Sequence, residues 1–229
     1  IIRGFNGFGF SATCISLISF ILPTIEIVPI ILILEVLVSV FMIPYIWSNI
    51  DWKFVLQISI GIMMGTPIGL YLLKFLSPSI THLSICGIVI FFVILQIRGY
   101  SNKKINNLPV KILTGSISGV VNGLGTLGGM PVSLFLLVTR VKPIIIRGSL
   151  AAIFFLTDIY AFGLSYLGSI VDLTAIYRAL ILIPILPLGV FIGNKLFVKS
   201  KEETYRKYVF YFLVIISIIG IIKVINNLY

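Results

Sequence analysis

The feature that most constrains this chain is a run of glycines inside a strongly apolar segment. The run Asn122-Gly-Leu-Gly-Thr-Leu-Gly-Gly-Met-Pro131 lies within a hydrophobic stretch from about Val110 to Thr139. Glycine weakens a helix, and proline removes an amide donor and blocks helix continuation. Non-helical backbone survives at membrane depth only where it is buried in protein or lines a polar cavity. Because the amides exposed at a helix break suit an anion, the run predicts half of a transport site.

The composition is that of an integral membrane protein. Hydrophobic residues make up 59% of the 229 residues, and charged residues make up only 10%. A soluble domain carries about 25% charged residues. The net charge of +10 would suggest nucleic acid as the partner of a soluble protein. Here the basic residues stand in short loops between apolar segments, so we expect them to set the orientation in the bilayer.

The chain divides into two similar halves. Hydrophobic segments fall at about 1–22, 27–47, 54–76, 79–98, 110–139, 144–167, 173–198 and 208–226. Three landmarks recur in the same order: Asn6-Gly-Phe-Gly9 with Asn122-Gly-Leu-Gly125, Ile50-Asp-Trp52 with Val171-Asp-Leu173, and Gly65-Thr-Pro-Ile-Gly69 with Gly189-Val-Phe-Ile-Gly193. We therefore expect repeat 1 in residues 1–98, a cytoplasmic linker in 99–109 and repeat 2 in 110–229, together forming one transmembrane domain. Only five residues precede Asn6, which predicts that the first element of repeat 1 is truncated.

The positions of lysine and arginine favour an inverted arrangement of the two repeats. If all eight segments cross the membrane, the 17 basic residues divide eight against nine between the two sides. If the two glycine-rich segments instead dip in and return, the division becomes thirteen against four. Cytoplasmic loops carry an excess of these residues, so the re-entrant topology is favoured, and a broken helix that crosses fully is its alternative. The expected fold is thus all-α and polytopic, with two inverted repeats of four segments, each headed by a glycine-broken helix.

Two acidic residues lie inside apolar segments. A charged side chain at the bilayer centre costs about 2.5–3.5 kcal/mol even on the lenient insertion scale, so such residues face the bundle interior or a cavity. Glu35 is interpreted as a proton or cation carrier, as a partner for an arginine, or as a protonated acid that bonds neighbouring helices. Asp158 is its counterpart in repeat 2, although the repeat offsets place it nearer Ser39 than Glu35. Both are candidates for proton coupling.

The candidate anion site combines the two breaks with one arginine. Asn6 and Asn122 offer side-chain amides, and capping of the broken helix ends is the alternative explanation for them. Arg147 offers a fork of donors that suits an oxyanion, unless it only extends to the membrane interface. Arg3 stands three residues before Asn6 and is a weaker candidate. The predicted substrate-binding residues are Asn6, Gly7, Gly9, Asn122, Gly123, Gly125, Gly128, Gly129, Pro131 and Arg147.

Other chemistry has little support in the sequence. His82 is the single histidine, so no metal site and no serine–histidine pair is expected, and no cofactor is predicted. A phosphate-binding Walker motif is absent too, which argues against an enzyme that hydrolyses ATP. Glycines spaced by four, such as Gly61, Gly65 and Gly69, are more typical of close helix packing than of substrate contact.

With these residues in view, the chain resembles the sulfite exporter TauE/SafE family of membrane permeases. The resemblance rests on the two Asn-Gly-x-Gly elements, Gly128-Gly-Met-Pro131, Glu35, the stretch from Ile50 to Gly69, and Arg147-Gly-Ser-Leu with Phe154-Phe155. Family members often have Gly-Gly-Pro-Pro and Arg-Ala at the corresponding places. The resemblance implies a multi-pass protein of the cell membrane that transports small sulfur-containing anions such as sulfite or organosulfonates. The alternatives are a non-transporting membrane scaffold and a transporter of another small anion. Assembly of the chain as a homodimer is also considered.

Overall fold

The computed structural model of the protein describes residues 1–18, 21–97, 106–139 and 141–199, and the single positions 211, 215 and 218. The described residues form helices and no strand. The expected segment at 208–226 and most of the linker at 99–109 lie outside the described residues. The helices are α1 (Ile2–Asn6), α2 (Phe10–Ile18), α3 (Thr24–Ile46), the 3-10 turn η1 (Trp47–Asn49), α4 (Trp52–Phe75), α5 (Pro78–Ile97), α6 (Leu108–Gly125), α7 (Gly129–Val138), α8 (Pro143–Leu167), α9 (Leu173–Leu182) and α10 (Ile185–Lys199).

Three of the described helices are long and apolar enough to cross a membrane. They are α3 with its 3-10 turn, α4 and α8, of 26, 24 and 25 residues. At 1.5 Å per residue each exceeds the roughly 30 Å of the hydrocarbon core. The segment expected at 173–198 is not one straight helix, because α9 and α10 are bent by 50° at the break after Leu182. Pro184 stands in this break, where it can donate no backbone hydrogen bond.

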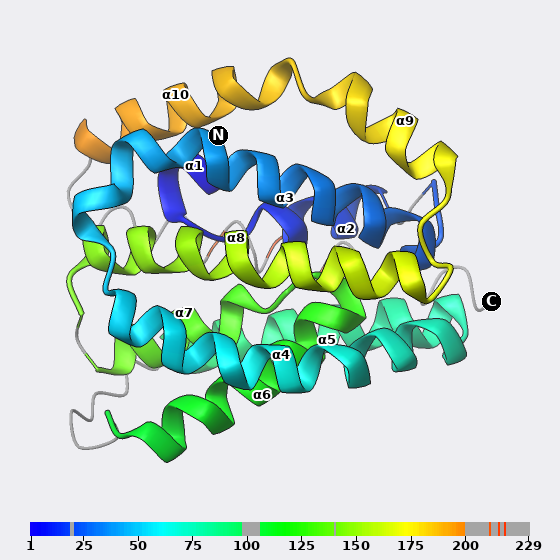
Figure 1. Cartoon of the computed structure of the whole chain (residues 1–229), viewed down its shortest axis with the longest axis horizontal. Helices are drawn as coiled ribbons and strands as arrows, with labels where there is room; N and C mark the ends of the chain where they lie inside the picture. Colours follow the sequence, from blue (N-terminus) through cyan, green and yellow to red (C-terminus); the bar gives the residue numbers. More distant parts are fainter. Residues whose placement is uncertain are drawn as a thin grey trace.

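The helices are stacked in layers around α3 and α8. Figure 1 shows α8 running through the middle of the molecule, with α1, α2 and α3 above it and α9 and α10 above these. Below α8 lie α4, α5, α6 and α7 (Figure 1). The main apolar core fills the space between these layers and draws on both halves of the chain, including Ile15, Ile31, Ile58, Leu150 and Ile153.

The two faces of α4 have different residues. Its outward face presents exposed apolar side chains at four-residue spacing, namely Leu56, Ile60, Met64 and Ile68. This stripe is suited to lipid, since apolar side chains lose nothing when they face hydrocarbon. The inward face carries the glycines at the same spacing, and it packs against α6.

The contact between α4 and α6 is a glycine-on-glycine seam, which confirms the packing interpretation of these residues. A Cβ added at Gly61 would come within 3.0 Å of the Gly115 Cα, and one added at Gly69 within 2.8 Å of the Gly123 Cα. The remaining members of the seam, Gly65 and Gly119, face backbone atoms of the partner helix. A smaller seam joins α10 to α1, where Gly193 meets the backbone of Gly4 and Phe5. In each case a helix from one half packs against the first helix of the other half.

Helix boundaries and special backbone positions recur at one fixed spacing. The starts of α2 and α7, Phe10 and Gly129, are 119 positions apart, and so are the starts of α3 and α8, Thr24 and Pro143. Left-handed residues end α1 and α6 at Gly7 and Thr126, again 119 positions apart. The landmark that aligned Asn6 with Asn122 therefore differs from the structural spacing by three residues, which is about one helical turn.

The recurring aspartates begin helices. Asp51 accepts a hydrogen bond from the amide of Phe54 at 3.0 Å, and Asp172 accepts one from the amide of Ala175 at 2.7 Å. Aspartate is a favoured residue at this position because its carboxylate satisfies an amide that has no partner within the helix. The landmark at 50–52 and 171–173 is thus explained by helix capping.

Candidate functional site

Both glycine-rich runs interrupt a helix, as the sequence predicts. In the first, α1 ends at Asn6, and Gly7 and Gly9 adopt positive φ angles of 80° and 90° before α2 begins. In the second, α6 ends at Gly125, and Thr126 takes a φ angle of 53° before α7 begins at Gly129. Gly7 has no room for a side chain, because a Cβ there would come within 2.9 Å of the Arg147 Cα. Glycine is the residue that adopts this conformation without strain.

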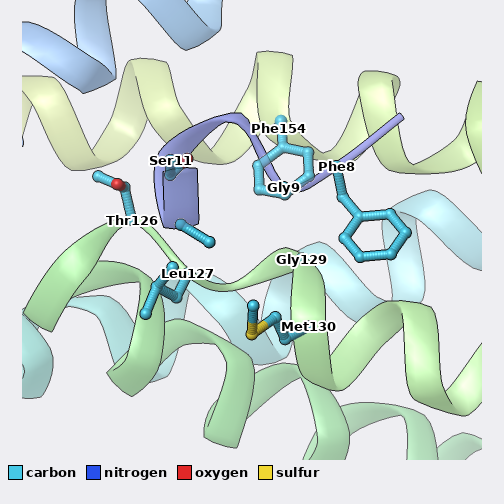
Figure 2. A pocket seen from close by; sticks show the side chains of 9 residues that line it. Phe8, Gly9, Ser11, Thr126, Leu127, Gly129, Met130 and Phe154 are labelled. Atoms are coloured by element: carbon cyan, nitrogen blue, oxygen red, sulfur yellow. The ribbon is translucent and has the colours of Figure 1, made fainter. Parts of the chain in front are cut away.

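The two breaks meet at a small cavity. Figure 2 shows Phe8, Gly9 and Ser11 of the first break on one side, and Thr126, Leu127, Gly129 and Met130 of the second on the other. Phe154 of α8 closes the cavity beside Gly9 (Figure 2). The cavity volume is about 10 Å³, close to the minimum that one water molecule needs. The first turns of α2 and α7 both contribute to its wall, so the positive ends of two helices converge there.

A buried ion pair lies behind one wall of this cavity. The Arg3 guanidinium forms an ion pair with the Glu35 carboxylate, and their side chains are only 2% and 1% exposed. Arg3 also donates to the Ser39 hydroxyl at 2.9 Å, and its Cζ lies 4.1 Å from the centre of the Phe154 ring. Ser11, which lines the cavity, donates to the Glu35 carboxylate. Two cavity residues, Ser11 and Phe154, are thus the direct neighbours of the pair.

A second polar cluster is built on the other break. The Asn122 side chain donates to Asp158 Oδ1 at 3.0 Å, and its own oxygen accepts from the Gly128 amide at 3.4 Å. Ser118 donates to the Gly128 carbonyl and fixes the same loop. Asn122 therefore holds the broken helix end and Asp158 in place. Of its two predicted roles, the structure supports the capping of the break.

One carboxylate oxygen of Asp158 makes no hydrogen bond to the described residues. Its side chain is fully buried, and Oδ2 has no hydrogen-bond partner among the described residues. The carboxylate also lies close enough to Glu35 and Arg3 to interact with both electrostatically. The two acids predicted as a quasi-equivalent pair are thus both buried and interact with the same arginine, Arg3, with which Glu35 forms the ion pair.

Arg147 is buried within the protein. It is 2% exposed and donates to the Asn194 side-chain oxygen at 2.8 Å. Its Cζ lies 4.6 Å from the centre of the Phe197 ring. Both partners belong to α10, so the guanidinium is directed to the α8–α10 contact, and Arg147 is not among the residues that line the cavity.

The predicted substrate residues fall into three groups. Gly9 and Gly129 line the cavity. Asn6, Gly7, Asn122, Gly128 and Pro131 are buried in or beside the breaks without lining it. Gly123 and Gly125 face elsewhere: a Cβ on Gly123 would meet α4 backbone, and one on Gly125 would meet the Ile85 side chain at 2.8 Å.

The prediction did not include Ser11 and Phe154, which line the cavity, and it treated Arg3, which forms an ion pair with Glu35, as a weaker candidate. The sequence signal for Arg3 is its position one turn before the break, where a helix places its side chain beside the next core helix. The two halves make corresponding hydrogen bonds at one sequence spacing. Arg3 bonds to Ser39 and Asn122 bonds to Asp158, and in each bond the two residues are 36 positions apart.

No cluster of three or more His, Cys, Asp or Glu side chains that could hold a metal ion occurs in the described part of the chain. The site combines two helix starts, the paired cation Arg3 and the buried carboxyls of Glu35 and Asp158; the amides at helix starts suit a small anion.

Comparison with known proteins identifies one family. A sequence model described as sulfite exporter TauE/SafE matches residues 1–219. No curated protein and no solved structure matches the chain.

Proposed function

The chain belongs to the sulfite exporter TauE/SafE family of multi-pass membrane transporters, and on that premise we propose that it moves small sulfur-containing anions, such as sulfite or organosulfonates, by secondary transport. The observation that carries the proposal is the convergence of two broken helices on one cavity. Backbone amides at helix starts hold an oxyanion without a full charge on the protein, which makes release easier. A transporter needs this property because it must let go of what it binds.

The small size of the cavity is consistent with a transport cycle. A space of about 10 Å³ is close to the minimum that one water molecule needs, so it is too small for a sulfite ion with its four heavy atoms. We infer that the breaks must separate to admit the substrate. Alternating access in transporters with internal repeats arises when one group of helices moves against the other around a central site.

We also propose that the two halves form an inverted repeat with re-entrant first elements. The constant spacing of 119 between boundaries of α2 and α7 and of α3 and α8 supports the repeat. The starts of α6 and α8 lie at the same end of the molecule, on the left of Figure 1, which supports a re-entrant path for α6 and α7. Several helix ends on this side carry a basic residue: Lys53 follows the start of α4, Lys111 lies in the first turn of α6, Lys142 precedes α8, and α10 ends at Lys199. We therefore assign it to the cytoplasm.

Cysteine labelling tests this orientation. In a variant whose native Cys14 and Cys86 are serines, Ser79→Cys at the start of α5 is expected to react with a membrane-impermeant maleimide in sealed cells. Lys142→Cys at the start of α8 is expected to react only after the cells are permeabilised. Both positions are exposed, so accessibility within the protein does not distinguish them. Labelling of Lys142→Cys in sealed cells would reverse the assigned orientation.

Transport itself is tested with purified protein in liposomes. We expect sulfite or methanesulfonate to enter protein-containing vesicles faster than protein-free vesicles, with and without an imposed pH gradient. If the protein accelerates the entry of only a different small anion, such as nitrate or acetate, the protein is a transporter but its substrate is not a sulfur-containing anion. Vesicles that move none of these anions would favour a non-transporting membrane scaffold. Such a scaffold has no need of two helix breaks around one cavity.

A further inference from the structure

We propose that Arg3 is the residue whose full positive charge binds the transported anion, and that Glu35 occupies Arg3 in the closed state as an exchangeable internal counter-ion. This inference rests on the proposed anion transport and specifies how its site works. It assigns the binding charge to a residue outside the glycine-rich runs. It also makes the uptake of one proton a condition of binding.

The first argument is the position of the pair. Arg3 is separated from the cavity by the Phe154 ring, whose centre lies 4.1 Å from the guanidinium carbon. Glu35 is joined to the cavity wall through the hydroxyl of Ser11. Rotation of one side chain, Phe154, would therefore connect the cavity with the guanidinium. Arginine presents a fork of donors that matches the oxygens of sulfite or a sulfonate better than any other side chain.

The second argument is that Glu35 and Phe154 occupy corresponding positions. They are 119 positions apart, the spacing that separates the starts of α3 and α8. Each contacts Arg3, one as an ion-pair partner and the other through its ring. Arg3 thus contacts the Glu35 carboxylate and the Phe154 ring, which lines the cavity. If the ring moves away, an anion from solution can take its place beside Arg3.

The third argument is charge balance. Burial of an uncompensated charge in a low-dielectric interior is costly, so the single positive charge of Arg3 compensates one negative charge at a time, and Glu35 is the carboxylate that forms the ion pair with it. An incoming monoanion would leave Glu35 without compensation. If Glu35 takes one proton from the solution as the anion binds Arg3, the cluster gains one positive and one negative charge, and its net charge is unchanged. Anion and proton therefore enter the site together.

Few other groups can titrate beside Glu35. The groups of neighbouring helices that interact with it are the Arg3 guanidinium of α1, the Cys14 thiol of α2 and the Asp158 carboxylate of α8. Arg178 of α9 is paired instead with Glu26 at the start of α3, nine residues or about 13 Å away along the helix. The described lysines on the other helices packed against α3 are exposed, namely Lys53, Lys74, Lys195 and Lys199.

The test compares two variants that differ only at Arg3. Glu35→Gln removes the internal counter-ion, and the double variant Arg3→Gln/Glu35→Gln removes both charges of the pair, while the buried Asp158 carboxyl is the same in both variants. Binding is measured in detergent by thermal stabilisation with sulfite and with methanesulfonate, which stays a monoanion across the pH range used. Arg178→Gln, which removes an exposed arginine, is the control.

We expect wild-type affinity for methanesulfonate to fall roughly tenfold for each unit of pH increase above neutrality, the slope for uptake of one proton. In Glu35→Gln this dependence should disappear, and at pH 8 the variant should bind at least tenfold more tightly than wild type. The double variant should lose binding, and Arg178→Gln should behave like wild type. In unbuffered detergent solution, a pH electrode should record the uptake of about one proton for each anion bound by wild type and of none by Glu35→Gln.

Two results would overturn the inference. One is a double variant that binds as tightly as Glu35→Gln, because Arg3 would then not hold the anion. The other is a Glu35→Gln variant whose affinity matches wild type at every pH. A wild-type protein that binds neither probe contradicts the proposed function itself, and this outcome is distinct from both.

Discussion

Gly65→Ala is expected to destabilise the protein strongly, although it adds only one methyl group. The new Cβ would overlap the carbonyl oxygen of Ser116 and come within 2.9 Å of the Val120 amide. Both are backbone atoms of α6, so relief requires the helices to separate along the whole seam. Overpacking costs typically about 1–3 kcal/mol, which corresponds to a fall in melting temperature of roughly 2–12 °C for a chain of this size. Thermal unfolding of detergent-solubilised protein measures the effect.

Gly163→Ala is the matched control for this substitution. Gly163 lies in α8, and a Cβ there would meet nothing within 4 Å. Alanine is favoured over glycine in a helix by about 1 kcal/mol, so we expect no loss and a small gain in melting temperature. Equal melting temperatures for Gly65→Ala and Gly163→Ala would show that the α4–α6 seam does not limit stability.

Gly129→Ala is expected to stop transport while it leaves a folded protein. Its Cβ would overlap the tip of the Phe154 ring and lie 3.2 Å from the Phe8 Cβ. Because one face of the ring is covered by the Arg3 guanidinium, the added methyl group restricts the movement of the ring that opens the cavity. An added barrier of about 1.4 kcal/mol slows a step tenfold, and we expect at least this loss in the initial rate of anion uptake into liposomes.

Gly125→Ala separates this effect from a general disturbance of the second break. Its Cβ would meet the Cδ1 atoms of Ile85 and Ile15, at 2.8 Å and 3.5 Å, and Gly125 is not among the residues that line the cavity. These are the ends of flexible side chains, so uptake should stay within about twofold of wild type, a change of only about 0.4 kcal/mol. Slower uptake by Gly125→Ala than by Gly129→Ala would place the passage on the Ile85 side of the break.

The helices and their interruptions could be predicted from the sequence because they depend on local chemistry. The apolar segments are long, and Gly9, Thr126 and their neighbours have backbone requirements that glycine-rich runs meet. The paired acids were also predicted, and Asp158 lies at the position that corresponds to Ser39, as the repeat offsets indicated. The bend between α9 and α10 was missed, although Pro184 was a visible signal for it.

The interior of the site could not be predicted in the same way, because corresponding positions carry chemically different residues. Arg3 and Asn122 make the corresponding hydrogen bonds to α3 and α8, and Glu35 corresponds to Phe154. An alignment guided by identical residues matched Asn6 with Asn122 and so displaced the register by one turn. The contact between Arg3 and Phe154 depends on packing between the halves, which the sequence pattern of neither half contains.

The first helix of each half packs against a helix of the other half, and this arrangement also constrains how the protein is made. α1 packs against α10, and Gly4 meets the Val190 backbone nearly two hundred residues later. Ribosomes add about 5–20 residues per second, so α1 must remain without its final partner for roughly 10–40 s while the rest of the chain is synthesised. The Arg3–Glu35 pair can form as soon as α3 has emerged. It is thus the earliest long-range contact able to hold the N-terminal helix inside the nascent bundle until α10 arrives.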